Sequence, residues 1–344
     1  MEQKSANDIF KEFKSHSISE FFKRNSQMLG YAGRVRSLTT VVHEYVTNSL
    51  DACEEAGILP EIFVEIKEVE ESKHLVTVRD NGPGIPSQFI GKALASILSG
   101  TKFHRYLQQR GQQGIGASGC TLFAQITTGK GVHVVSRTSS ESFECDVAID
   151  VNKNEPIITN FKNIEGNGFT GLEIIGLFGE TKYENSERGV LEYLKRTALV
   201  NPHANITLKD PDGKEHVFVR TSNILPERPK ESKPHPLGIT TSDLMYLAEL
   251  SSSRYISTFL VESLSRVTKQ KIDELKNLIP DIDLEKSPHE LTWEEGEKIV
   301  RALKKIKWMA PETDTLSLIG KEQIEKAISA ILMPEFVSTT QRRP

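Results

Sequence analysis

Glu44, Asn48 and Asp51 lie at i, i+4 and i+7 in the run Glu-Tyr-Val-Thr-Asn-Ser-Leu-Asp-Ala that begins at residue 44. A helix places these three positions on one face, and the apolar neighbours Val42 and Tyr45 start a second face with the same period. The amide oxygen of Asn48 suits a hard cation such as Mg²⁺, which proteins share with substrate phosphates. Glu44, one turn earlier, suits the orientation or deprotonation of a water that attacks phosphorus. Asp51 fits a role supporting such a pocket and a plain helix-surface role equally well.

A second polar motif ends a short strand. The run Val-Thr-Val-Arg-Asp-Asn-Gly-Pro-Gly-Ile over residues 76–85 predicts a strand followed by a glycine-punctuated turn. Asp80 can accept a hydrogen bond from an exocyclic amine, while Gly82 and Gly84 let the backbone approach a flat ring. Taken alone, this motif is also typical of an ordinary turn, as the first is of a solvated helix face.

A glycine-rich run, Gly-Gln-Gln-Gly-Ile-Gly-Ala-Ser-Gly, covers residues 111–119 and opens the apolar segment Ile115–Ile126. It predicts exposed backbone amides at a helix N-terminus, where the helix dipole favours phosphate oxygens. Its spacing is neither the dinucleotide-binding fingerprint nor the P-loop. The three motifs together indicate a site for a nucleotide and Mg²⁺.

In this order, Glu-x-x-x-Asn-x-x-Asp-Ala, Asp-Asn-Gly-x-Gly-Ile and Gly-x-x-Gly-Ile-Gly resemble the motifs of the GHKL superfamily, the Bergerat-fold ATPases. Longer runs resemble the archaeal-type B subunits of the type IIB DNA topoisomerases, the topoisomerase VI family. These runs are Ile18–Asn25, Leu50–Pro60, Arg110–Gly116, Asn201–Ala204, Lys233–Pro236 and Asp314–Gly320. The resemblance covers essentially the whole chain.

The resemblance implies a role for each site residue. Glu44 would activate water, Asn48 would hold Mg²⁺, and Asp80 with Gly82 and Gly84 would bind the adenine of ATP. Thr101 and Lys102, on a polar loop over residues 99–110, would reach phosphate as part of a lid. The residues whose backbone would wrap the phosphates are Gly111, Gln112, Gln113, Gly114, Ile115, Gly116, Ala117 and Ser118.

The resemblance also implies partners. Two copies would dimerise on ATP and gate the passage of double-stranded DNA, which relaxes supercoils. The chain offers no defensible strand-cutting tyrosine, so cleavage would come from a separate A subunit within a heterotetramer. Such an enzyme would be soluble and cytoplasmic.

The predicted fold class is α+β. It is a Bergerat two-layer sandwich of a mixed sheet and helices, followed by an all-α helix–two-turns–helix domain. The expected ATP-binding domain covers residues 1–225, with an N-terminal helical extension. A proline-rich linker at 226–236, a helical domain at 237–308 and the start of a truncated transducer region at 309–344 follow.

The chain departs from the family in two places. Leu172 stands where the family has a threonine, so either nucleotide binding is weakened or the nearby hydroxyl of Thr170 compensates. The expected transducer, with a lysine that reaches the γ-phosphate, is largely missing. We therefore expect nucleotide binding to survive, hydrolysis to be slow and coupling to DNA transport to fail.

The composition, 37% hydrophobic and 26% charged residues over 344, is that of a folded protein. A net charge of −4 excludes a generally basic nucleic-acid-binding surface, so DNA contact requires local patches. Acidic residues lie among the lysines of the helical domain. A solvent-exposed surface is therefore a simpler interpretation of these lysines than a DNA-binding surface. The three cysteines lack metal-ligand spacing.

Three alternatives share the pocket. A histidine kinase needs a phosphoacceptor histidine ahead of the site, and only His16 and His43 precede Asn48. A second alternative is a nucleotide-dependent clamp or regulator with little turnover. Leu172 and the missing transducer favour this function, whereas the presence of Glu44 argues against it. A mismatch-repair or chaperone ATPase fits the motifs but not the whole-chain resemblance.

Overall fold

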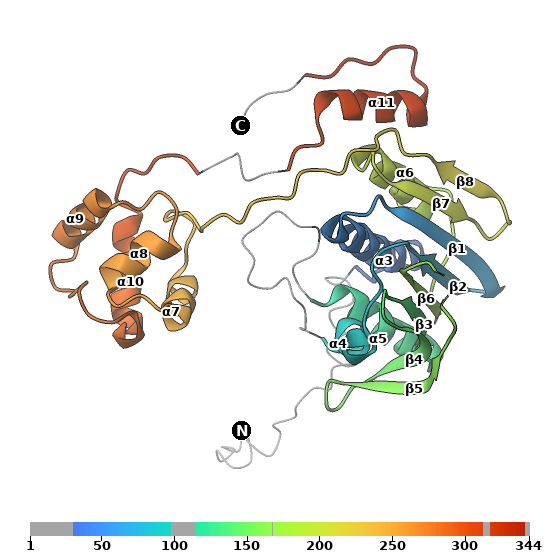
Figure 1. Ribbon diagram of the computed structural model, residues 1–344, viewed down its shortest axis with the longest axis horizontal. Coiled ribbons are helices and arrows are strands. Elements are labelled where there is room, and N and C mark those ends of the chain that lie inside the picture. The colour runs from blue at the N-terminus through green and yellow to red at the C-terminus, as the bar shows by residue number, and fades with distance from the viewer. Residues whose placement is uncertain (1–29, 98–109, 111–113, 167, 312–316, 341–344) are drawn as a thin grey trace, which may run out of the picture. The chain divides into compact units, whose positions relative to one another are not determined.

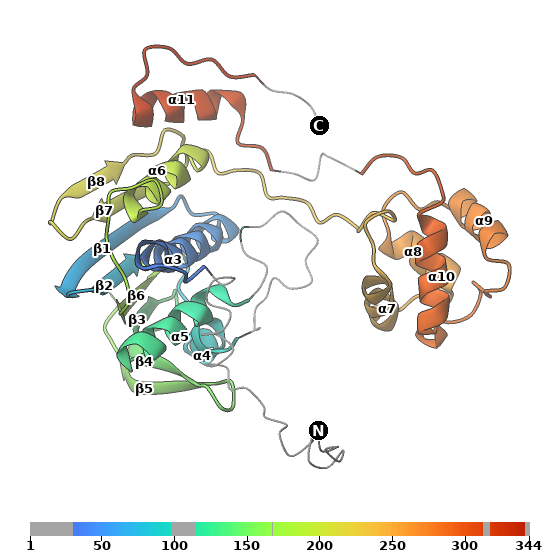
Figure 2. The same ribbon diagram turned by 180° about the vertical axis from the view of Figure 1, so that it is seen from behind.

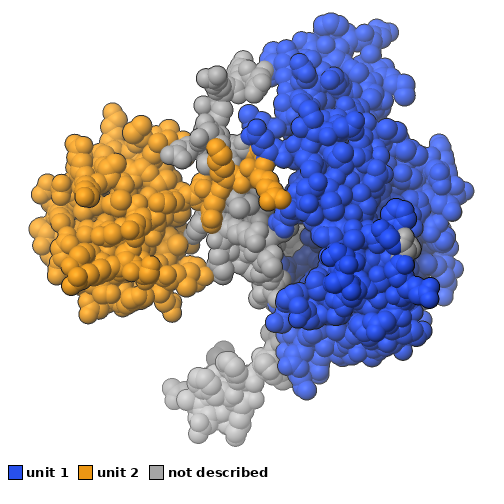
Figure 3. Space-filling view, in the orientation of Figure 1, with its two compact units in different colours: residues 1–103, 109–227, 318–343 blue, residues 104–108, 228–317, 344 orange. Residues whose placement is uncertain are grey.

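The computed structural model describes residues 30–97, 110, 114–166, 168–311 and 317–340. The chain divides into two compact units, coloured separately in Figure 3. The first contains the described residues up to Glu227 together with those from Leu318 onward, and the second runs from Arg228 to Ser317. Element labels follow Figure 1.

The first unit is built on one mixed sheet of eight strands in the order β5-β4-β3-β6-β2-β1-β7-β8. The strands are β1 (Glu61–Glu70), β2 (Lys73–Arg79), β3 (Val132–Arg137), β4 (Ser142–Asp150), β5 (Glu155–Asn163), β6 (Gly171–Phe178), β7 (Asn205–Lys209) and β8 (Glu215–Phe218). Among the described strands, the pairing of β1 with β7 is parallel and all other pairings are antiparallel. The sequence predicts a hairpin from Ile206–Leu208, the turn at residues 210–213 and Val217–Val219, and this is confirmed, because β7 and β8 pair across that turn.

Helices cover one face of this sheet, as Figures 1 and 2 show from opposite sides. They are α3 (Arg34–Ala56), α4 (Ser87–Ala95), α5 (Gly116–Thr128) and α6 (Val190–Val200). The core lies between the layers because alternate strand residues such as Ile62, Val64 and Ile66 are buried, as period-2 patterning predicts. The α+β fold class is therefore confirmed.

Helix α11 (Lys321–Leu332) follows the second unit in sequence but packs against α6 of the first. Its Ala327 is fully buried, and Ile331 packs against the first unit's core. The first unit is thus completed by residues that lie beyond the helical unit in the chain.

The second unit is helical, with its own core. Its elements are α7 (Thr241–Leu250), α8 (Ile256–Ser263), α9 (Lys269–Leu278), the 3-10 turn η1 (Pro288–Glu290) and α10 (Trp293–Leu303). The sequence predicts one helical pattern over Leu244–Leu264, whereas the structure breaks it after Leu250. Serines favour this break, since Ser251 is extended and its Oγ accepts from the Ser253 N–H at 3.1 Å.

Two expectations lie outside the described residues: the N-terminal helix before Asn25, and the loop at residues 99–110 except for Arg110. Among the residues that the structure describes, no helix is both long and apolar enough to span a membrane.

Candidate active site

Helix α3 presents the first two candidate residues. It begins after Gly33 and ends at Gly57, whose left-handed conformation caps the last turn with bonds to the Cys53 and Glu54 carbonyls. Its apolar side, which includes Val42 and Val46, is buried in the core. Glu44 is half-buried and Asn48 is exposed. In the described part of the chain, neither side chain has a hydrogen-bonding partner, so both remain available to a ligand.

The Glu44 carboxylate lies directly against the first residue of α5. A Cβ built on Gly116 would lie 2.9 Å from the Glu44 carboxyl carbon and closer still to one of its oxygens. Only a residue without a side chain lets the carboxylate reach this helix end. Burial raises the pKa of Glu44, and His43 opposes the rise through its charge. A raised pKa brings a carboxylate nearer to the range that suits a general base at neutral pH.

The start of α5 supplies donors beside this carboxylate. Gly114 has a positive φ of 57°, which turns the chain into the helix. The first amides of a helix have no partner within it, so those of Gly116, Ala117 and Ser118 are available to an anion. The Ser118 side chain is buried and donates to the Ile115 carbonyl. Ser118 would therefore donate to an anion through its backbone N–H.

Asp80 is 8% exposed at the end of β2. Its Oδ1 accepts from the amides of Gly82 at 2.9 Å and Leu172 at 3.2 Å, and its Oδ2 accepts from Ser49 Oγ at 2.7 Å. Burial raises the pKa of Asp80, while these hydrogen bonds favour the ionised form. A carboxylate offers about four acceptor positions. Oδ2 therefore retains one, which suits an amine donor.

Two neighbouring residues act through their backbones. Gly84 has a φ of 71°, and a Cβ there would meet the Arg137 carbonyl carbon at 2.8 Å, so packing against β3 itself requires glycine. Leu172, where the sequence departs from the family's threonine, uses both of its backbone groups on Asp80: its carbonyl accepts from the Asp80 N–H, and its N–H donates to the Asp80 Oδ1. Its side chain packs partly buried against the core.

The arrangement fits Mg²⁺ carried with a phosphate ligand. The described residues contain no cluster of three His, Cys, Asp or Glu side chains that could hold a metal by themselves. Mg²⁺ usually takes one or two protein oxygens and completes its octahedron with water and phosphate. The exposed amide of Asn48, one turn from Glu44, is an oxygen donor of this kind.

The structure brings Glu44 of α3, the helix that also carries Asn48, against Gly116 at the start of α5, and it buries Asp80 beside Ser49 of α3. Thr101, Lys102, Gly111, Gln112 and Gln113 lie outside the described residues. No role for Ser49 was predicted from the sequence. The sequence signal that could have identified Ser49 is its position directly after Asn48, which places it on the inward side of the helix.

Asp51 is buried in an ion pair with Arg110, which excludes the plain surface role. Arg110 also bonds Glu54 and Asn201, and Glu54 pairs with His203. The runs that contain these partners were noted in the sequence, but their long-range pairing was not predicted.

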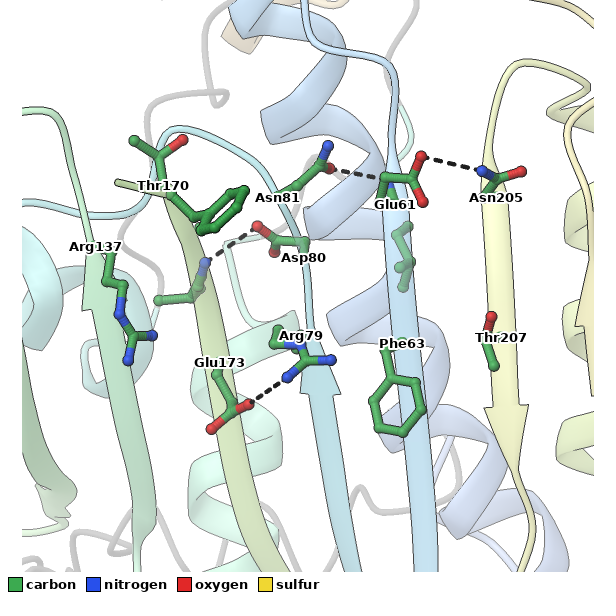
Figure 4. A pocket seen from close by; sticks show the side chains of 14 residues that line it. Glu61, Phe63, Arg79, Asp80, Asn81, Arg137, Thr170, Glu173, Asn205 and Thr207 are labelled. Atoms are coloured by element: carbon green, nitrogen blue, oxygen red, sulfur yellow. Dashed lines mark hydrogen bonds and ion pairs between the residues drawn. The ribbon is translucent and has the colours of Figure 1, made fainter. Parts of the chain in front are cut away.

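A hollow of about 620 Å³ lies on the sheet face opposite to the helices. Phe63, Arg79 and Glu173 point into it from β1, β2 and β6, and Figure 4 shows them in front of the strands with a helix behind. Asp80 and Asn81, at the end of β2, also line it. Glu44, Asn48 and residues 114–118 do not line it, so Asp80 is the candidate residue that this hollow shares with the helix-side arrangement.

Residues 33–155, which carry Glu44, Asn48, Asp80 and residues 114–118, match the family described as histidine kinase-, DNA gyrase B- and HSP90-like ATPase. The chain is 45% identical to the B subunit of type 2 DNA topoisomerase 6 from Pyrococcus abyssi, over 98% of this chain and 68% of that protein. It is 44% identical to the protein of the same name from Thermococcus sibiricus, over 100% and 69%. The corresponding protein of Methanothermobacter thermautotrophicus is 45% identical, over 99% and 66%. The chain therefore belongs to the family of type 2 DNA topoisomerase 6 B subunits and contains its GHKL ATPase domain.

Proposed function

We propose that this chain binds Mg²⁺ and ATP on the helix side of its sheet and hydrolyses the nucleotide there. The observation that carries the proposal is the contact of Glu44 with the N-terminus of α5, where a side chain on Gly116 would displace the carboxylate. In this position a carboxylate of raised pKa would act as the base beside amides that suit phosphate oxygens. Asn48 would hold Mg²⁺, and Asp80 would accept the adenine amine.

We further propose that ATP joins two copies of the chain into a dimer. In this dimer the chain would gate the passage of double-stranded DNA, together with a separate A subunit that cuts the strands. The family membership supports this assembly, because the related proteins are named as B subunits of a topoisomerase. We assign no tyrosine of this sequence to DNA cleavage, which agrees with cleavage by a separate A subunit.

Two substitutions on α3 test the proposal by separating binding from turnover. Glu44→Gln keeps the shape of the side chain and removes the base. It should bind a non-hydrolysable ATP analogue as the wild type does and lose about 10²- to 10⁴-fold in phosphate release. Asn48→Ala removes the metal's oxygen donor and should abolish Mg²⁺-dependent binding. Glu192→Gln, which breaks an exposed pair with Arg196 on α6, is the matched control.

Size measurements with Mg²⁺ and the analogue complete the test. A dimer that forms with nucleotide in the wild type and in Glu44→Gln, but not in Asn48→Ala, supports the proposed ATP-dependent dimer that gates DNA passage. A wild type that dimerises but releases no phosphate supports the clamp alternative. Unchanged phosphate release in Glu44→Gln would contradict the role of this carboxylate.

A further inference from the structure

The hollow lies on the face of the sheet opposite to the helices, called here the open face. Five neighbouring strands line it, in the order β3-β6-β2-β1-β7. Its volume of about 620 Å³ lies in the range of pockets that hold small organic ligands. Because charged, polar and aromatic side chains all contribute to the lining, the chemistry of a ligand can be read from them.

Arg137 lacks a counter-charge among the described residues. It ends β3, is half-buried, and points into the hollow in Figure 4. In that part of the chain its guanidinium forms no ion pair, and its Nε is buried without a hydrogen-bond partner. Burying a polar or charged group without a partner costs free energy. An anionic group on a ligand would offset this cost.

The acidic side chains that line the hollow are already engaged. Glu61 pairs with Arg220. Glu173 lies 3.8 Å from Arg79. Asp80 accepts three hydrogen bonds, two from backbone amides and one from a serine hydroxyl. The partner that the hollow lacks is therefore an anion for the arginine at the end of β3, and not a cation.

A second feature of the hollow suits a flat group. Phe63 of β1 and Arg79 of β2 are opposite each other in register, and the Arg79 guanidinium carbon lies 5.1 Å from the centre of the Phe63 ring. The Arg79 side chain is still 56% exposed. A planar guanidinium with one face on an aromatic ring can stack a second flat group on its other face. Phe169, also exposed, adds apolar surface to the lining.

The sheet sets the spacing between these two features. Strand β6 lies between β3 and β2, so the strands that carry Arg137 and Arg79 are two spacings apart, about 10 Å. Gly171 of β6 is opposite Arg137 in register and places no side chain between the two arginines at that level. A ligand that reaches both must combine a flat ring system with an acidic group at one end. A fused two-ring carboxylic acid has these features.

We propose that the hollow binds a small aromatic carboxylate, whose ring stacks on Arg79 and whose carboxylate pairs with Arg137. The occupant is a free organic acid, because the hollow has the volume of a small-molecule pocket and one anionic partner is missing from it. This is a second site on the chain, since Glu44, Asn48 and residues 114–118 do not line it. The proposal does not depend on the proposed binding of ATP.

The test measures calorimetric binding of naphthalene-2-carboxylate to the full chain, with naphthalene-2-carboxamide as a neutral probe of the same shape. The carboxamide should bind about 10- to 100-fold more weakly, because it cannot form the charged hydrogen-bonded pair. Arg137→Met should weaken the carboxylate by the same factor and leave the carboxamide unchanged. Arg137→Lys keeps the charge without the planar fork and should recover part of the loss.

Two further variants complete the comparison. Glu173→Gln removes the acid beside Arg79 and should tighten binding of the carboxylate. Arg196→Met is the matched control, since it removes an exposed ion pair elsewhere in the same unit. If Arg137→Met does not fold, Arg137→Lys and Glu173→Gln decide.

The nucleotide site is tested separately. The carboxylate should still bind when Mg²⁺ and a non-hydrolysable ATP analogue are saturating, and it should bind Asn48→Ala as it binds the wild type. A wild type that binds the carboxylate but not the analogue supports this site and refutes the proposed function alone.

Four results would overturn the second site. They are a wild type that binds neither probe, equal affinity for the two probes, no loss in Arg137→Met, and displacement of the carboxylate by the analogue. Tighter binding of a short peptide that ends in phenylalanine would also overturn it, because the occupant would then be a chain terminus and not a free acid.

Discussion

Replacing Gly116 by alanine should separate catalysis from folding at the contact between α3 and α5. Gly116 has no positive φ, so alanine can adopt its backbone conformation. Alanine is also preferred over glycine in helices by about 1 kcal/mol. The new Cβ would nevertheless lie 2.9 Å from the Glu44 carboxyl carbon, where ordinary contact begins at 3.4 Å. The carboxylate, whose nearer oxygen overlaps the Cβ, must retreat by about 1 Å.

A displacement of about 1 Å in a catalytic group costs about 10²-fold in rate. We therefore expect Gly116→Ala to keep or raise the midpoint of thermal unfolding while phosphate release falls by about that factor. Binding of a non-hydrolysable ATP analogue should fall less, because the amides of the helix end remain. The assays are phosphate release at saturating Mg²⁺ and ATP, and calorimetric titration with the analogue.

The double variant provides the control for mechanism. If Gly116→Ala acts through the carboxylate, then Gly116→Ala with Glu44→Gln should be no slower than Glu44→Gln alone, because the same group is lost twice. Phosphate release at the wild-type rate in Gly116→Ala would show that the position of the Glu44 carboxylate does not limit hydrolysis. Fully additive losses in the double variant would do so as well.

Two further predictions concern stability. Burial favours the protonated form of Glu54, but hydrogen bonds from His203 and Arg110 hold its pKa below the ordinary value, so the unfolded chain binds the proton more tightly. Stability contributed by Glu54 is thus present above about pH 4.5 and lost as the pH falls further; urea unfolding from pH 7 to 3 should show this loss, and Arg110→Met should flatten it. Leu260 is fully buried in the helical unit, so Leu260→Ala should lower the free energy of unfolding of that unit by about 2–5 kcal/mol. Affinity for the ATP analogue should stay unchanged, and a large change in that affinity would contradict this prediction.

Local periodicity predicted much of the fold. The buried face of α3, the alternating strand β1 and the β7–β8 hairpin each follow from patterns within about ten residues. The helix break after Leu250 was not predicted, because the apolar spacing continues across it while the serines bond locally. The docking of α11 on α6 was not predicted either, since no local pattern specifies a partner so distant in sequence.

The candidate site shows the same limit. The sequence predicted the polar face of α3 and the glycine-rich helix start, since both are local patterns. It did not predict that Gly116 makes room for Glu44, or that Arg110 pairs with Asp51, because these contacts join segments about 60 to 70 residues apart. For Gly84 the sequence predicted a role in letting the backbone approach a ligand. The structure gives a different reason for glycine, because the backbone there approaches β3 so closely that packing alone requires it.

The most direct test of the account is calorimetric titration of the chain with Mg²⁺ and a non-hydrolysable ATP analogue, for the wild type and Asp80→Asn. The variant should fold, because its amide oxygen can still accept from Gly82 and Leu172 while Ser49 turns to accept from the new NH₂ group. That NH₂ group would face the adenine amine, donor against donor, and binding should be lost. We expect one site per chain in the wild type, dependent on Mg²⁺, and none in Asp80→Asn. A wild type that does not bind, or a variant that binds equally well, would contradict it.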